Sequence, residues 1–280
     1  MARDIIEEYP IESDGARALV TIRGAHGKGQ TYDVSIPSIA AATQALLDDI
    51  KQQLAGKISI SAAEILDPKA IIGLKRKLGD DARALLAERL PGIDAQTRDS
   101  LVTSILNSTL GLGDIEFLLG DPVLEEIVVP GAGTPVRVYH KKHGWLETNI
   151  LIATEQQVQN YASIIARRVG KQLTTLTPLL DAHLVTGDRA NAVLFPISNK
   201  GNTITIRKFA RDPWTIVDFI TGKTVSSGVA ALLWMAVQYE MNIIVSGGTA
   251  SGKTSLLNVL MSFMPPNHRI LSIEDTRELQ

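Results

Sequence analysis

A glycine-rich run at residues 246–254 reads Ser-Gly-Gly-Thr-Ala-Ser-Gly-Lys-Thr and matches the phosphate-binding pattern G-x-x-x-x-G-K-[ST]. An apolar run at residues 243–245 precedes it and a helix-like pattern follows at residues 255–261, which is the strand, loop and helix context that the pattern requires. Glycines let the backbone wrap round a polyphosphate, so that N–H groups face the anion. The sequence therefore predicts a nucleotide-binding loop; the alternative, a chance glycine-rich turn with an exposed lysine, does not explain both flanks.

Two side chains of this loop have specific roles in the prediction. We expect Lys253 to reach the β and γ phosphates of ATP and the Thr254 hydroxyl to ligate Mg²⁺. The residues expected to hold the nucleotide are Gly247, Gly248, Thr249, Ala250, Ser251, Gly252, Lys253, Thr254 and Ser255.

Two acids follow a second apolar run, at the predicted end of a strand. Glu274 and Asp275 come after Ile270, Leu271 and Ile273. Open α/β sheets place catalytic groups at the carboxyl ends of their strands, and ATP hydrolysis requires a carboxylate that orients or deprotonates the attacking water. Glu274 is therefore the candidate for this role. On position alone, two solvated acids at a strand end are the slightly favoured interpretation.

The sequence after the glycine-rich loop is too short for all the strands of a complete nucleotide-binding sheet. Gln280 lies 27 residues after Lys253 (280 − 253 = 27), whereas a complete phosphate-loop domain needs several more parallel strands. We therefore expect a truncated chain or a part of a longer one. The alternative is a complete protein with a degenerate nucleotide domain.

Composition limits the classes of protein. The 280 residues are 45% hydrophobic and 21% charged, as in an ordinary soluble protein. A net charge of −2 gives no global attraction for nucleic acid, so we expect no nucleic-acid partner. No apolar run reaches the roughly 20 residues of a membrane span, and the first residues lack the features of a signal peptide, so a cytoplasmic protein is predicted. Cysteine is absent, which excludes disulfides and thiolate metal sites.

Residues 1–110 are predicted to form an N-terminal hairpin and a helical docking region. Residues 17–36 alternate loosely between apolar and polar around a glycine-rich turn, which is typical of a β-hairpin. From residue 38 to about residue 109, leucine and isoleucine recur at helical spacing. Breaks in this pattern are expected at Pro68, Gly79 and Pro91-Gly92, which would divide it into a small helical bundle.

Residues 111–208 mix helical and strand patterns and are predicted to form an α+β domain, followed by a linker at 209–214 and a partial nucleotide-binding domain at 215–280. The fold class is therefore α/β multidomain. Helices are expected at 113–119, 154–169 and 225–239, and strands at 126–129, 136–140, 192–195, 203–208, 242–246 and 269–274.

Four motifs between residues 111 and 279, about 60% of the chain (169/280), occur in the order and approximate spacing of a known family. They are Leu179-Leu180-Asp181-Ala182 with Thr186-Gly187-Asp188-Arg189-Ala190-Asn191-Ala192, then Thr205-Ile206-Arg207-Lys208-Phe209, then residues 247–254, then Ile273-Glu274-Asp275-Thr276-Arg277-Glu278-Leu279. Together they resemble the secretion and pilus motor ATPases of the type II and type IV secretion superfamily. The sequences of these motifs are most similar to those of archaeal members that drive adhesive pili, archaella or protein export.

This resemblance implies a PAS-like N-terminal domain beside a RecA-like domain, here only its first part, with ATP bound between them and six subunits in a ring. It implies a membrane platform protein as partner, and a cytoplasmic location at the inner face of the cell membrane, with membrane contact only through that partner. It favours a catalytic or magnesium-linked role for Glu274. It also places Arg189 and Arg207 against the γ-phosphate, where guanidinium groups neutralise developing charge. Without the resemblance, both would be surface residues in weak ion pairs.

Two other functions compete with an ATP-driven motor. The chain could be a docking module that binds partners through residues 1–110 and does not hydrolyse ATP. A RecA-like helicase would show a basic channel and stacking aromatics, which 5% aromatic residues do not favour. The basic cluster Lys141-Lys142-His143 is predicted to be a solvated hairpin tip, and His183 has no second ligand at metal-binding spacing.

Overall fold

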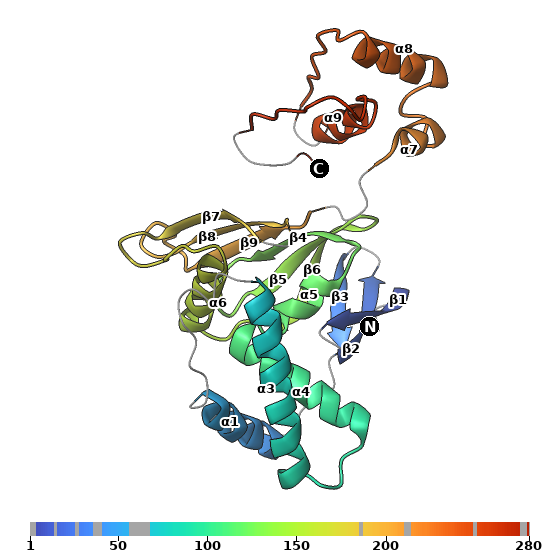
Figure 1. Cartoon of the computed structure of the whole chain (residues 1–280). Helices are drawn as coiled ribbons and strands as arrows, with labels where there is room; N and C mark the ends of the chain where they lie inside the picture. Colours follow the sequence, from blue (N-terminus) through green and yellow to red (C-terminus); the bar gives the residue numbers. More distant parts are fainter. Residues whose placement is uncertain are drawn as a thin grey trace. The chain divides into compact units, whose positions relative to one another are not determined.

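The computed structural model describes residues 4–13, 16–25, 28–35, 41–55, 68–184, 187–209, 214–248, 251–274 and 279. The chain divides into two compact units, Met1–Phe209 and Ala210–Gln280, and each is described by itself. The predicted mixed α/β class is confirmed, since a large sheet is combined with helices (Figure 1). The described helices are α1 (Ala41–Ala55), α3 (Pro68–Arg89), α4 (Ala95–Leu110), α5 (Ile115–Gly120), α6 (Glu155–Arg168), α7 (Ile216–Thr221), α8 (Ser227–Gln238) and α9 (Lys253–Met261).

A nine-stranded sheet forms the centre of the first unit, with the order β1-β2-β3-β6-β5-β4-β9-β8-β7 among the described residues (Figure 1). Neighbouring strands run antiparallel, except that β3 and β6 are parallel. The predicted hairpin is present as β2 and β3, whereas the sequence pattern does not predict β1, β6 or β7. The strands are β1 (Asp4–Ser13), β2 (Ala16–Ala25), β3 (Lys28–Ser35), β4 (Leu124–Val129), β5 (Pro135–His140), β6 (Gly144–Leu151), β7 (Leu179–His183), β8 (Arg189–Val193) and β9 (Thr203–Arg207).

One face of the sheet is covered by helices and the other face is open. Successive side chains of a strand point to opposite faces, so neighbouring residues in a strand divide between the two. Ala190 of β8 and Ile206 of β9 are buried and share a hydrophobic core with Ile165 of α6 and with residues of α5. Figure 1 shows α5 and α6 on the same side of the sheet. Arg189 and Arg207, next to these buried residues in the chain, therefore lie on the open face.

Helices α1, α3 and α4 have a separate hydrophobic core, which includes Leu47, Leu86 and Ile105. Helix α3 begins at Pro68, as predicted, and a turn at Pro91-Gly92 separates it from α4. The predicted break at Gly79 is wrong, because α3 continues through it. A Cβ at Gly79 would lie 3.6 Å from Leu106 Cδ1, so this glycine sits at the contact between α3 and α4, where tertiary packing offsets its low helix propensity.

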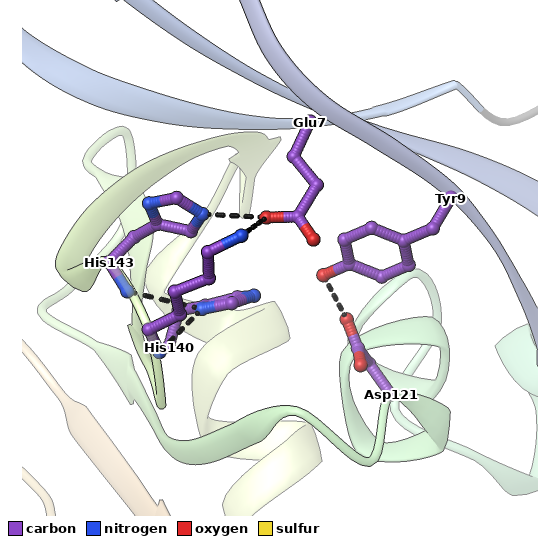
Figure 2. Close-up of polar contacts among 6 residues, drawn as sticks. Glu7, Tyr9, Asp121, His140 and His143 are labelled. Atoms are coloured by element: carbon purple, nitrogen blue, oxygen red, sulfur yellow. Dashed lines mark hydrogen bonds and ion pairs between the residues drawn. The ribbon is translucent and has the colours of Figure 1, made fainter.

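A buried carboxylate fastens the N-terminal strands to the rest of the first unit. Asp121, which is fully buried, accepts hydrogen bonds from the hydroxyls of Tyr32 (2.6 Å) and Tyr9 (2.9 Å) and from the backbone N–H of Val123 (2.9 Å). Figure 2 shows Tyr9 pointing from β1 toward Asp121. Burial, together with the charge of Asp121, raises the pKa of both tyrosines, so their hydroxyls stay protonated and donate.

Replacing Asp121 by alanine is expected to lower the free energy of unfolding by about 2 to 4 kcal/mol, because two tyrosine hydroxyls would lose their acceptor in the interior. The measurement is the urea unfolding midpoint, followed by circular dichroism. Glu12→Ala is the control, since Glu12 lies on β1 in an exposed, 3.9 Å ion pair with Arg17 and should change stability by less than about 0.5 kcal/mol. Equal destabilisation by both variants would contradict this role of Asp121.

The turn between β5 and β6 carries the basic cluster. Glu7 of β1 accepts a hydrogen bond from Lys142 Nζ (3.1 Å) and lies 2.8 Å from His143 Nε2 (Figure 2). These two hydrogen bonds, that of His143 first, hold the pKa of Glu7 below its ordinary value. The side chain of Lys142 is 69% exposed, but that of His143 is only 9% exposed. The prediction of a solvated tip is therefore wrong for His143, because β1 lies beside the turn.

The second unit contains α7, α8 and α9, and its described residues include no β-strand. The predicted strands at 242–246 and 269–274 are wrong: both segments lie outside regular secondary structure, with Ile244 92% and Leu271 76% exposed. A parallel strand takes its hydrogen bonds from neighbouring strands, and the described part of this unit offers none. In neither unit is a described helix long and apolar enough to span a bilayer.

Candidate functional site

The glycine-rich loop leads directly into α9. Gly252 has a φ of 84°, in the left-handed region that favours glycine, and the helix begins at the next residue. A Cβ at Gly247 would lie 2.5 Å from Ser251 Oγ, so a larger residue there would displace the Ser251 side chain. The Ser251 hydroxyl also donates to the Gly248 carbonyl (2.8 Å). The described part of the loop is therefore closed back on itself, and Thr249 and Ala250 lie outside the described residues.

The first turn of α9 is formed by residues 253–255, the last three of the predicted nucleotide-binding set. In such a turn the backbone N–H groups point out of the helix end, and the helix dipole adds positive potential. The backbone N–H of Leu256 donates a hydrogen bond to the Gly252 carbonyl (2.9 Å), at the start of this helix. This end of α9 is suited to an anion that the loop surrounds.

The Lys253 side chain folds back over the loop. Its ammonium group donates a hydrogen bond to the Gly248 carbonyl, five residues earlier in the chain. The cation is thus held above the backbone that is expected to surround the phosphates. A phosphate oxygen could take the place of the Gly248 carbonyl as its acceptor.

The candidate acid, Glu274, makes a hydrogen bond with a residue close to it in the chain. Glu274 Oε2 accepts a hydrogen bond from the backbone N–H of Leu279 (3.0 Å), and Asp275 lies outside the described residues. The carboxylate and the Thr254 hydroxyl are oxygen ligands of the kind that Mg²⁺ prefers. The catalytic role of Glu274 and the metal-binding roles of Glu274 and Thr254 stay predictions.

The structure brings the two candidate arginines together. Arg189 of β8 lies directly opposite Arg207 of β9, and both are on the open face of the sheet. The same cross-strand row continues to His183 of β7 on one side and to Glu126 of β4 on the other. We call these four residues the arginine row. Opposed side chains on antiparallel strands have Cβ atoms about 5 Å apart, so the two guanidinium groups extend from neighbouring positions on this face.

The turn before Arg189 fixes the end of the row. Gly187 has a φ of 90°, and a Cβ there would lie 3.0 Å from the ring of Phe209. Asp188 accepts a hydrogen bond from the backbone N–H of Phe209 (2.7 Å), which ties the turn before β8 to the end of β9. The Gly-Asp-Arg motif therefore holds Arg189 and Arg207 at the same level of the sheet.

Arg189 is held by a partner that the sequence analysis did not assign. Its Nε and Nη2 donate to the two carboxylate oxygens of Asp181 on β7, at 3.1 and 2.7 Å. This hydrogen bonding keeps the pKa of Asp181 below its ordinary value, so the carboxylate is ionised at neutral pH. Asp181 lies two residues before His183 on the same strand, and this alternation is the only sequence signal that places it near the arginine row.

The candidate residues therefore form two groups. The loop residues and Glu274 belong to the second unit, and the arginine row belongs to the first. Each group is suited to polyanionic ligands by itself: one through backbone N–H groups and an ammonium, the other through two guanidinium groups.

Comparison with known proteins gives a family for the C-terminal third of the chain. The family described as "Type II/IV secretion system protein" matches residues 181–280, which include Asp181, the arginine row except Glu126, the loop and Glu274.

Curated relatives extend the similarity. Two proteins of Methanocaldococcus jannaschii, named as uncharacterized proteins MJ0781 and MJ0900, are 44% identical over 60% of this chain and 37% identical over 67% of it. The type IV secretion system protein PtlH of Bordetella pertussis is 31% identical over 51% of the chain. The chain spans only 24%, 34% and 48% of the lengths of these three relatives.

One similar solved structure is described as the VirB11 ATPase from the Brucella suis type IV secretion system in complex with sulphate. It shares 24% sequence identity, covers 54% of this chain and 51% of its own, and has a TM-score of 0.33.

Proposed function

The chain belongs to the type II/IV secretion ATPase superfamily, as its motifs predict, and we propose that it binds and hydrolyses Mg-ATP to power protein secretion or the assembly of a pilus or archaellum. The observation that carries this proposal is the loop at residues 247–255. Its left-handed Gly252 opens α9, and its Lys253 ammonium lies over the loop backbone.

The loop would hold the triphosphate through its backbone. The N–H groups of residues 253–255 at the start of α9 face the β and γ phosphates, and Lys253 exchanges the Gly248 carbonyl for a phosphate oxygen. The Thr254 hydroxyl, in the first turn of α9, would hold Mg²⁺, which would neutralise phosphate charge when bound.

The chemistry requires two further groups. Glu274 orients or deprotonates the attacking water, for which it must exchange its hydrogen bond to the Leu279 N–H. Arg189 and Arg207 supply positive charge where negative charge develops on the γ-phosphate. These arginines belong to the first unit, and the loop belongs to the second.

The assembly follows from the family rather than from the geometry. We propose a PAS-like domain at 111–208 and the first part of a RecA-like domain at 215–280, joined by the linker at 209–214. Residues 1–110 would dock partners, and six copies would form a ring that acts on a membrane platform protein at the cytoplasmic face of the membrane.

Steady-state phosphate release, combined with light scattering after gel filtration, tests this function. We expect turnover that depends on ATP and Mg²⁺ and a species with the mass of six subunits. A preparation that binds Mg-ATP without turning it over would instead support the non-hydrolysing docking module.

A further inference from the structure

Asp181 and Arg189 form a two-point ion pair on the open face of the sheet. Both carboxylate oxygens accept from one edge of the guanidinium group, at 3.1 and 2.7 Å, a geometry that fixes the plane as well as the position of the group. The two side chains are 51% and 38% exposed. Exposed ion pairs contribute little to stability, so this pair is easily exchanged for another.

The ion pair with Asp181 determines toward which neighbouring strand the Arg189 side chain extends. Asp181 lies on β7, on one side of β8, whereas Arg207 lies on β9, on the other side. The bond to Asp181 therefore draws the Arg189 guanidinium toward β7 and away from Arg207. This separation relieves the repulsion between two directly opposed cations.

We propose that Asp181 is a positioning residue that holds Arg189 in a resting position, and that the triphosphate must displace Asp181 to recruit Arg189. This inference rests on the proposed function. A phosphate oxygen that approaches Arg207 offers Arg189 an alternative anion, so the guanidinium moves from the β7 side toward β9. Asp181 thereby competes with nucleotide for the same donor.

The groups around Asp181 favour its ionised form. Arg189 faces it from β8, His183 lies on its own strand, and Lys171 Nζ donates to the Asp181 carbonyl (2.6 Å). The hydrogen bond from Arg189 keeps the pKa of Asp181 low, so the carboxylate is ionised and competes for Arg189 at neutral pH.

Titration of the full chain with a nonhydrolysable Mg-ATP analogue tests the inference. Asp181→Asn removes the competing charge and should tighten binding by about two- to fivefold, the range expected for an exposed ion pair. Asp181→Glu keeps the carboxylate and should restore affinity close to that of the unmodified protein. In an Arg189→Ala background, Asp181→Asn should have no effect, because the donor for which it competes is gone.

A matched control lies on the same face of the sheet. Arg137 and Glu147 are directly opposed on β5 and β6, 2.6 Å apart and about half exposed. Glu147→Gln frees Arg137 in the same way and should leave the affinity unchanged.

The outcomes separate this inference from the proposed function. If the unmodified chain does not bind the analogue, the proposed function fails and the inference fails with it. If binding is normal and requires Lys253, but Asp181→Asn leaves it unchanged or weaker, only the inference is wrong. Tightening that persists without Arg189 would also overturn it.

Discussion

Replacing Lys253 by alanine should lower ATP turnover by about 10²-fold or more, the loss typical for removing one essential donor to a developing charge. The ammonium lies over the loop on the Gly248 carbonyl, within one side-chain movement of phosphates held at the start of α9. Alanine leaves the helix intact, because it is a better helix former than lysine. The measurement is steady-state phosphate release at saturating ATP.

Lys223→Asn is the matched control. Lys223 also lies in the second unit and has a φ of 58°, a left-handed conformation that asparagine tolerates better than alanine. This variant loses the same charge without touching the loop, so its turnover should equal that of the unmodified protein. If Lys253→Ala and Lys223→Asn had the same turnover, Lys253 would have no specific role in hydrolysis.

Arg189→Ala and Arg207→Ala should each lower kcat by about 10³-fold, as expected for an arginine that stabilises charge on a transferred phosphoryl group. Nucleotide binding should weaken far less, because the loop makes most ground-state contacts. Arg189→Lys and Arg207→Lys should recover only part of the rate, since an ammonium lacks the planar fork of a guanidinium. Steady-state kinetics, with kcat and KM determined separately, measure both effects.

Arg137→Ala is the control for these two variants, because Arg137 is also exposed on the open face of the same sheet but lies outside the arginine row. Its kcat should not change. A loss of kcat in all three variants would indicate a general effect of charge on this face. No loss in Arg189→Ala and Arg207→Ala would exclude the arginine row from catalysis.

The local sequence predicts most features that depend on neighbouring residues. The pattern around Lys253 predicts both the loop and the start of α9, and the punctuation at Pro68 and Pro91-Gly92 predicts the helices between them. Gly79 breaks this rule because its packing partner, Leu106, is 27 residues away in the chain (106 − 79 = 27). A local pattern carries no information about such a partner.

The arrangement of the candidate site depends on strand register, which a single sequence does not contain. The motifs identify Arg189 and Arg207 through a resemblance, but only the pairing of β8 with β9 shows that they are direct neighbours. Asp181 becomes the counter-ion of Arg189 through the pairing of β7 with β8. The strong apolar patterns at 242–246 and 269–274 predict buried strands, yet a strand forms only where a neighbour supplies its hydrogen bonds.

Isothermal titration of the chain with a nonhydrolysable ATP analogue, in the presence and absence of Mg²⁺, tests whether residues 247–255 bind nucleotide. We predict saturable binding of one nucleotide per chain that is strengthened by Mg²⁺ and weakened in Lys253→Ala. No binding, or binding that is the same with and without the Lys253 side chain, would contradict the assignment of residues 247–255 as the nucleotide site.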